Sequence, residues 1–274
     1  MKIAVFGLGI IGGVWAENLH QSGHEVARWN RSPKSVPGFV ADARAAAEKA
    51  ELIFIVVSDP PAVQSVLDQV LPVLKPAQMV IQSSTISPEA SKHFAAQVRA
   101  TGAAFLEAPF TGSKPAAENR KTIFFIGGNA SDLERARPVL AQLSSTIEHI
   151  GDIGSASALK LAMNVNIALV SEALCESLAL ARAAGISDER YFSILKLNSS
   201  HSRMADLKQP QLVARDFAPQ FSMKHMAKDI RLALASASAL NMPQTQSLMR
   251  LYEEGVKRGW GDDDFIGLTR LLDE

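Results

Sequence analysis

The chain of 274 residues contains a single cysteine, Cys175, so an internal disulfide framework is excluded. Proteins without disulfides are typical of reducing compartments, and we expect a cytoplasmic protein. The sequence also lacks an excess of charge of either sign, because 28 basic residues balance 28 acidic ones. Binding of nucleic acid needs a basic patch, so we expect no nucleic-acid partner.

Two further absences narrow the class of protein. No uninterrupted apolar run reaches about 18 residues, so we expect no transmembrane span and no membrane partner. The six histidines are scattered, and no pair has the spacing of a metal-binding motif, so we expect no metal site. What is present is 47% hydrophobic and 20% charged residues, which indicates an ordered globular chain of one or two domains.

The start of the chain has the pattern of a dinucleotide-binding unit. An apolar strand over 2–6 precedes the glycine-rich turn Gly7-Leu8-Gly9-Ile10-Ile11-Gly12, which opens a helix over about 11–22. Gly7 permits a tight turn, Gly9 lets the backbone approach a pyrophosphate, and Gly12 lets the helix pack closely on the strand. A secretory signal ending at Val14-Trp15-Ala16 is the alternative, but the glycine spacing and the strand–helix pattern behind it favour nucleotide binding.

The second strand, over about 24–29, ends at Asn30-Arg31-Ser32 and indicates which dinucleotide binds. An acidic residue that binds the ribose 2′-hydroxyl of NAD is usual at this place. Asn30 stands there instead, Arg31 can bind a 2′-phosphate through charge-assisted hydrogen bonds, and Ser32 adds a hydroxyl donor. The sequence therefore predicts NADP (NADPH) as cofactor; the alternative for Arg31 is a solvated surface arginine.

Strands alternate with helices up to about residue 150, which predicts an α/β fold with an N-terminal, doubly wound, mainly parallel sheet of Rossmann type. From 155 to about 184 the chain has no Gly or Pro, which predicts one long inter-domain helix, ended by Gly185. Every later segment has a helical pattern. We therefore expect an NADP-binding Rossmann domain over 1–152 and an all-α C-terminal domain for substrate binding and dimerisation over 153–274.

Three segments carry polar residues suited to chemistry. Lys160 and Asn164 are four apart on the long helix and share one face in apolar surroundings. The turn Thr111-Gly112-Ser113 follows a strand, and such a turn offers N–H groups and hydroxyls to a carboxylate. In a later helical segment, four residues fall near one another on successive turns: Phe221, Lys224, Lys228 and Asp229. The alternatives are a solvated lysine, an ordinary loop and a charged outer helix face.

Together these segments resemble the β-hydroxyacid dehydrogenase family, which includes 3-hydroxyisobutyrate dehydrogenases and glyoxylate/succinic semialdehyde reductases. The resemblance covers nearly the whole chain and rests on four motifs in order, at 7–19, 107–113, 154–164 and 221–229. Asn30-Arg31-Ser32 and Thr111-Gly112-Ser113-Lys114-Pro115 look closer to the NADPH-dependent semialdehyde reductase branch than to the NAD-dependent branch.

The resemblance implies a reaction and a role for each matching residue. NADPH would deliver hydride to the carbonyl of a small aldehyde that bears a carboxylate, such as a semialdehyde or glyoxylate. Lys160 would be the catalytic proton donor, and Asn164 would orient it or bind the substrate. The other substrate-binding residues would be Thr111, Gly112, Ser113, Phe221 and Asp229. Besides the glycine-rich turn and Asn30-Arg31-Ser32, the cofactor would contact Val57, Ser58, Thr85 and Lys228, with Ser83 and Ser84 near the nicotinamide. The family is commonly dimeric or tetrameric.

The sequence departs from the family pattern in two places. Thr111 stands where a serine is common, which keeps the hydroxyl. Glu118-Asn119-Arg120-Lys121 replaces a glycine-containing turn, so the shape of the loop is open. Two other functions also stay open, an imine reductase-like enzyme and a non-catalytic NADP-binding scaffold, and the presence of Lys160 argues against both.

Overall fold

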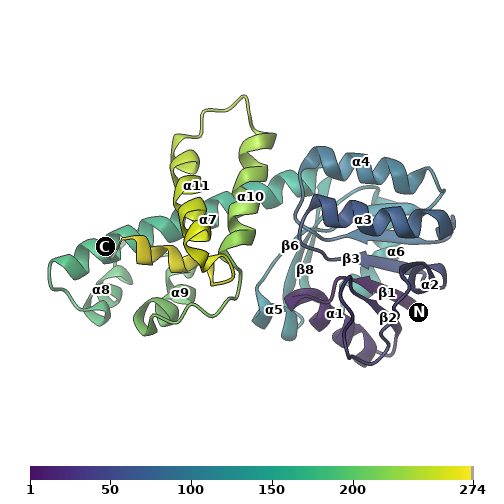
Figure 1. The fold of residues 1–274 in the computed structure, drawn as a ribbon, viewed down its shortest axis with the longest axis horizontal. Helices are drawn as coiled ribbons and strands as arrows, with labels where there is room; N and C mark the ends of the chain where they lie inside the picture. Colours follow the sequence, from purple (N-terminus) through teal and green to yellow (C-terminus); the bar gives the residue numbers. More distant parts are fainter. Residues whose placement is uncertain (273–274) are drawn as a thin grey trace. The chain divides into compact units, whose positions relative to one another are not determined.

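A computed structural model of the chain describes residues 1–272, which form two compact units (Figure 1). Unit 1 is Met1–Leu161, and unit 2 begins at Ala162. This division of the contacts lies inside helix α7 (Ser155–Ala183), nine residues after the predicted domain boundary at 152/153. The physical reason is that hydrogen bonds join the start of α7 to the end of a strand in unit 1.

Unit 1 contains an eight-stranded sheet in the order β2-β1-β3-β4-β5-β7-β6, with β8 also paired to β7. Neighbouring strands from β2 to β5 are parallel, whereas β7 runs antiparallel to β5 and β6. The strands are β1 (Lys2–Phe6), β2 (Glu25–Trp29), β3 (Leu52–Ile55), β4 (Met79–Gln82), β5 (Ala104–Glu107), β6 (Phe110–Thr111), β7 (Thr122–Gly127) and β8 (Ser144–Gly151). The predicted doubly wound, mainly parallel sheet is confirmed.

Helices cover both faces of this sheet, which explains why the central strands are apolar throughout. One hydrophobic cluster joins α2, α3 and α4 to one face, and a second joins α1, α5 and α6 to the other. Helices α3 and α4 lie side by side (Figure 1). The helices are α1 (Ile10–Gln21), α2 (Ala43–Glu48), α3 (Pro60–Val70), α4 (Pro88–Arg99), α5 (Lys114–Glu118) and α6 (Ala130–Leu140), with a 3₁₀ turn at Leu71–Val73.

Strand β6 and helix α5 were not predicted. They have two and five residues, too few for an alternating or helical pattern to show. Both lie in the Thr-Gly-Ser segment, so the predicted loop is in fact a short strand and a short helix joined by a turn.

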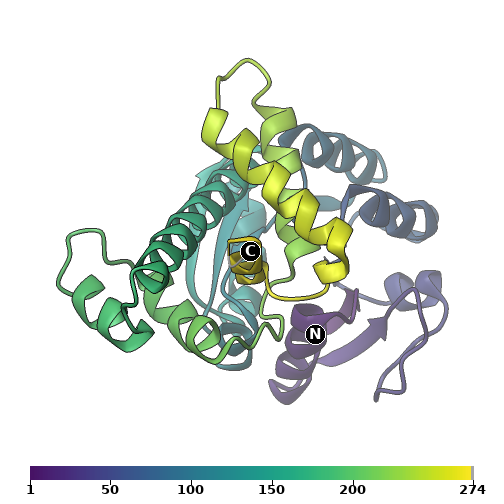
Figure 2. The same cartoon turned by 60° about the vertical axis from the view of Figure 1, so that its left-hand side comes forward.

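Unit 2 is helical, and its described part, 162–272, contains no strand beyond the isolated bridge between Ser222 and Asp264. Helices α10 and α11 pack side by side, as the green and yellow pair in Figure 2 shows. The remaining helices are α8 (Asp188–Leu195), α9 (Arg203–Ala214), α10 (Met223–Ser236) and α11 (Pro243–Gly255), followed by a π-helical turn at Val256–Trp260 and a 3₁₀ helix at Phe265–Leu271. The predicted last α-helix is therefore a 3₁₀ helix.

The long helix α7 ends as the sequence predicts. Gly185 has a φ of 77°, a conformation that favours glycine, and the N–H of Ile186 reaches back to the carbonyl of Ala181. Ser187 then caps α8 by accepting from the N–H of Arg190. By length and composition α7 is the one described helix that could cross a membrane, but its buried side chains, such as Leu174 and Leu178, belong to the core of unit 2. A core helix passes the same test.

Candidate functional site

The carboxyl ends of four parallel strands meet at one edge of the sheet in unit 1. Phe6, Ile55, Gln82 and Glu107 are register neighbours from β1 through β5. The predicted site residues of unit 1 that directly follow these strands therefore lie at the same edge of the sheet. Doubly wound folds bind ligands at this edge of the sheet, at the place where β2 and β3 lie on opposite sides of β1.

The glycine-rich turn has the geometry that its sequence predicts. Gly7 has a φ of 102°, and a Cβ there would lie 2.1 Å from the carbonyl oxygen of Val56. A Cβ on Gly12 would lie 2.0 Å from the carbonyl oxygen of Gly7. A Cβ on Gly9, by contrast, would meet nothing within 4 Å, and Gly9 caps α1 without a side-chain hydrogen bond. Open space at a helix N-terminus fits the pyrophosphate of a dinucleotide.

Asn30 supports this turn. Its Oδ1 accepts from the N–H of Leu8 at 3.0 Å, and its Nδ2 donates to the carbonyl of Ser32 at 2.8 Å. The amide thus links the end of β2 to the glycine-rich turn, while Arg31 and Ser32 are exposed. The predicted cofactor residue Asn30 accordingly acts on the backbone around it, a role the sequence did not indicate.

A second group of predicted residues lies after β3 and β4. The N–H of Val57 donates to Oγ of Ser84 at 2.8 Å, so the two loops are joined. Ser58 is exposed and donates to Asp59. The Oγ of Ser83 is fully buried and has no hydrogen-bond partner within 1–272, while Thr85 is half-buried. An unpartnered buried hydroxyl after β4, at the carboxyl edge of the sheet, fits a polar ligand group.

The Thr-Gly-Ser turn lies between β6 and α5. Thr111 ends β6, Gly112 has a φ of 118°, and Ser113 caps α5 through its backbone carbonyl only. All three residues are half-buried. No backbone N–H of α5 donates to the hydroxyl of Ser113. The turn therefore carries two hydroxyls, and that of Ser113 is not used to cap α5.

Arg120 lies in the segment that replaces a glycine-containing turn of the family pattern. It adopts the left-handed conformation, with a φ of 55°, and so keeps the backbone shape that a glycine would give. Its guanidinium donates to Oγ of Ser22 at 2.7 Å and to the carbonyls of Asn18 and Gln142. These bonds offset the steric cost of the conformation, about 1–2 kcal/mol.

Helix α1 supports both the glycine-rich turn at its start and the Thr-Gly-Ser segment along its side. Asn18 donates to the carbonyl of Ala117 in α5 at 2.9 Å, and the indole of Trp15 donates to Oγ1 of Thr122 in β7. Both side chains are buried. The predicted cofactor and substrate segments of unit 1 thus share one rigid support.

Lys160 lies in the second turn of α7, within unit 1. Its side chain is buried, with 8% of the residue exposed. This burial excludes a solvated lysine, the alternative that the sequence left open. Asn164, one turn further along α7, belongs to unit 2.

In unit 2 three of the predicted residues form one polar cluster. Nδ2 of Asn164 donates to Oδ2 of Asp229 at 2.5 Å, and Nζ of Lys228 lies 2.8 Å from Oδ1 of the same carboxylate. Asn164 and Asp229 are buried, and Lys228 is half-buried. Asp229 therefore holds both the amide and the ammonium through its two oxygens.

Phe221 packs on two other rings. It stacks on His225, with ring centres 6.2 Å apart, and meets Phe265 edge-on at 6.1 Å. Nδ1 of His225 pairs with Oγ of Ser222 at 2.7 Å. Burial and then the neighbouring Lys228 lower the pKa of His225, which favours the neutral imidazole.

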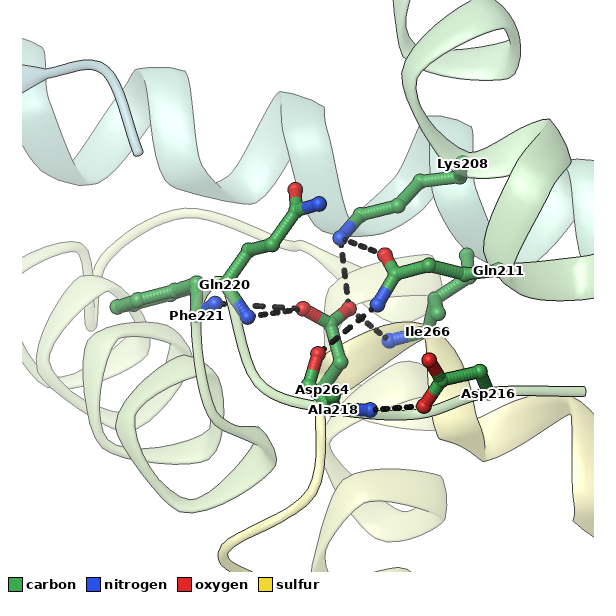
Figure 3. A network of polar contacts seen from close by, with 8 residues as sticks. All are labelled: Lys208, Gln211, Asp216, Ala218, Gln220, Phe221, Asp264 and Ile266. Carbon is green, nitrogen blue, oxygen red and sulfur yellow. Dashed lines mark hydrogen bonds and ion pairs between the residues drawn. The ribbon is translucent and has the colours of Figure 1, made fainter. Parts of the chain in front are cut away.

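A buried ion pair fixes the backbone of Phe221 (Figure 3). Nζ of Lys208 lies 2.7 Å from Oδ1 of Asp264, and Oδ2 of Asp264 accepts from the N–H groups of Gln220 and Phe221. Lys208 also donates to Gln211. Burial lowers the pKa of Lys208, while Asp264 opposes that shift. The network holds the segment that leads into α10.

Sequence reasoning missed four residues that shape these sites: Glu107, Arg120, Lys208 and Asp264. Arg120 had a signal, because it replaces a glycine in the family pattern. The two members of the ion pair are 56 residues apart, and no local pattern links them. Within 1–272 no group of three or more His, Cys, Asp or Glu side chains is placed to hold a metal ion.

Both parts of the chain match known families. Residues 2–151 match the family described as the NAD binding domain of 6-phosphogluconate dehydrogenase. Residues 154–272 match the family described as NAD-binding of NADP-dependent 3-hydroxyisobutyrate dehydrogenase. The two matches follow each other along the chain and together cover nearly all of it.

The chain is similar to whole proteins over its full length. It is 31% identical to 2-hydroxy-3-oxopropionate reductase of Escherichia coli, over 100% of the chain and 97% of that protein. It is 29% identical to glyoxylate/succinic semialdehyde reductase 1 of Arabidopsis thaliana, over 99% and 98%. A solved Mycobacterium tuberculosis 3-hydroxyisobutyrate dehydrogenase with L-serine has a TM-score of 0.89 at 27% identity, over 99% of each chain. The chain belongs to the β-hydroxyacid dehydrogenase family of NAD(P)-dependent oxidoreductases.

Proposed function

We propose that this enzyme is an NADPH-dependent reductase that transfers hydride to the carbonyl of a small carboxylate-bearing aldehyde, a semialdehyde or glyoxylate. The observation that carries the proposal is the buried Lys160, held in the same unit as the glycine-rich turn and the Thr-Gly-Ser turn. A buried lysine in a nucleotide-binding unit is suited to proton transfer beside the cofactor.

The proposed mechanism rests on three groups of this chain. When bound, the nicotinamide supplies the hydride. Thr111, Gly112 and Ser113 hold the substrate carboxylate through hydroxyl and N–H donors. The ammonium of Lys160 stabilises the negative charge that develops on the carbonyl oxygen and donates the proton. Asn164, whose amide donates to Asp229, orients Lys160 or binds the substrate.

The test of the catalytic role is Lys160→Met. We expect turnover to fall about 100- to 10,000-fold, while NADPH binding measured by fluorescence titration stays within the range of the parent enzyme. Lys49→Met is the matched control, because Lys49 is an exposed lysine of unit 1. Unchanged turnover in Lys160→Met would remove the proposed proton donor.

We assign NADP as the cofactor on the basis of the exposed Arg31 and Ser32 and the absence of an acid at Asn30. Asn30 uses its amide on the local backbone, so no carboxylate opposes a 2′-phosphate. Arg31→Ala should raise the KM for NADPH about tenfold or more and leave the KM for NADH nearly unchanged. Arg44→Ala, another exposed arginine of unit 1, is the control. An equal change for both cofactors would contradict the assignment.

The substrate class is tested by a panel of aldehydes with NADPH. Succinic, methylmalonate and tartronate semialdehydes and glyoxylate carry a carboxylate beside or beyond the carbonyl, so all suit the Thr-Gly-Ser turn. We expect Ser113→Ala to raise the KM for these substrates and to leave the KM for NADPH unchanged. Reduction of cyclic imines without reduction of any aldehyde would point to the imine reductase alternative.

We also propose that the enzyme works as a homodimer or homotetramer in the cytoplasm. Most large exposed apolar side chains lie in unit 2, including Leu180 at 74% and Leu197 at 82% exposed. Where such residues form a contiguous patch, that patch marks a surface for protein–protein contact. Light scattering after gel filtration should give a multiple of the chain mass of 29.5 kDa, and a monomer would contradict the proposal. Cell fractionation tests the location.

A further inference from the structure

Glu107 is a fully buried carboxylate that the proposed mechanism does not use. It is the last residue of β5, at 0% exposure, and it directly precedes the segment that leads to the Thr-Gly-Ser turn. A buried charge is costly unless it is satisfied by partners, so its contacts indicate its purpose.

The partners of Glu107 are at the start of α7, except for Ser91 in α4. Its Oε1 accepts from the N–H groups of Gly154 and Ala156, both at 2.8 Å, and from that of Ser157 at 3.4 Å. Its Oε2 accepts from the hydroxyls of Ser157 at 2.8 Å and Ser91 at 2.5 Å. The carboxylate therefore caps the helix that carries Lys160.

This arrangement satisfies the charge without a cation. Three of the five donors are N–H groups at a helix N-terminus, where the helix dipole favours negative charge. Room for the carboxylate exists because Gly127 has no side chain: a Cβ there would lie 2.1 Å from Oε1. The site is thus shaped around the carboxyl group of Glu107.

Two of the donors are one helical turn before Lys160. Ala156 and Ser157 are its i−4 and i−3 neighbours, so the hydrogen bonds of α7 carry any shift of the first turn to Lys160. Along the chain, Glu107 begins the segment that leads to the Thr-Gly-Ser turn. All of these residues, Lys160 included, belong to unit 1.

We propose that Glu107 is a positioning residue, whose carboxylate sets the place of the Lys160 ammonium relative to the Thr111-Gly112-Ser113 turn. The inference rests on the proposed function, because it acts through Lys160. A small misplacement of a catalytic group can cost about 100-fold in rate, so the effect is measurable.

The experiment is a double-mutant cycle between Glu107→Gln and Lys160→Met. Glutamine keeps the size of Glu107 but has one acceptor oxygen, so it cannot accept from the N–H groups and from the hydroxyls at the same time. Single-turnover oxidation of NADPH by saturating aldehyde gives the rate of hydride transfer. With Lys160 present, Glu107→Gln should lower this rate about 10- to 100-fold and leave the Kd for NADPH within about threefold. In the Lys160→Met background it should change the rate less than about threefold.

Two further variants keep the test decisive. Gln78→Leu also removes a buried side chain that holds a helix end, since Gln78 donates to the carbonyls of Ala47 and Ala50, but it lies away from α7. It should lower stability and not the hydride-transfer rate. Ser157→Ala removes one hydroxyl donor and gives a milder version of the same effect if Glu107→Gln does not fold.

The outcomes separate the two claims. If Lys160→Met retains full activity, the proposed function fails. If Lys160→Met is impaired but Glu107→Gln lowers the rate by the same factor in both backgrounds, Glu107 acts on the fold alone and the inference fails. It also fails if Glu107→Gln leaves the rate unchanged with Lys160 present.

Discussion

Glu107 in unit 1 and Asp264 in unit 2 are both carboxylates at 0% exposure, yet their charges are balanced in different ways. Glu107 receives only N–H groups and hydroxyls, at the start of a helix. Asp264 also receives N–H groups, but it pairs with the buried ammonium of Lys208 at 2.7 Å. The difference shows that a helix N-terminus with two hydroxyls can replace a cation.

The two solutions differ in what remains when one member is removed. Loss of the charge on Glu107 leaves only uncharged N–H groups and hydroxyls, which can donate to other acceptors. Loss of the charge on Asp264 leaves the ammonium of Lys208, 4% exposed in its side chain, without its counter-ion. A buried charge without a partner is among the most costly features in a protein.

The largest effect is therefore expected for Asp264→Asn. We expect the free energy of unfolding of unit 2 to fall by about 3–5 kcal/mol, measured by urea denaturation. Trp260 lies in unit 2 and can report this transition by fluorescence. The double variant Lys208→Met with Asp264→Asn should recover part of the loss, since both charges are gone. No recovery would mean that the ion pair is not the source of the cost.

The matching change in unit 1, Glu107→Gln, should cost less. We expect a fall of about 1–3 kcal/mol, because hydrogen bonds to a charged group are lost but no opposite charge is left unpaired. Trp15 and Trp29 report unfolding of unit 1. A cost equal to that of Asp264→Asn would show that the dipoles around Glu107 are as demanding as a cation.

Arg120 tests the same principle with the opposite sign of charge. Its guanidinium is satisfied by a hydroxyl and two carbonyls, without a carboxylate, and its backbone is left-handed. Arg120→Gly should be about 1 kcal/mol more stable than Arg120→Ala, because glycine adopts this conformation without steric cost. At Asn119, where φ is −90°, alanine should be the more stable of the two. The same order at both positions would contradict the strain.

The smallest effect is expected for Glu172, a carboxylate whose neighbour is another carboxylate. Burial and then Glu176 raise its pKa from 4.5 to about 7. The folded state therefore keeps a proton that the unfolded state loses, and stability falls as pH rises from about 4.5 to 7. Unfolding by urea across this range should show the fall in the parent enzyme and a smaller one in Glu172→Gln. Identical profiles would show that the raised pKa is not that of Glu172.

The sequence was sufficient for features that repeat locally. Glycine spacing located the nucleotide turn, and alternation of strands and helices predicted the sheet and the helical unit. Arg120 and Asn30 show where this stops, because their bonds reach Ser22, Gln142 and Leu8 across the fold. The pairing of Lys208 with Asp264 depends on tertiary packing, for which a single sequence has no periodic signal.

The space at Gly127 has a consequence for how this enzyme can diverge. A Cβ at this position would lie 2.1 Å from Oε1 of Glu107, so a side chain at 127 cannot be accommodated while Glu107 keeps its place. We expect descendants of this chain to inherit the two positions as a pair. A lineage that gains a side chain at 127 must first give up the glutamate at 107, and this order constrains its evolutionary path.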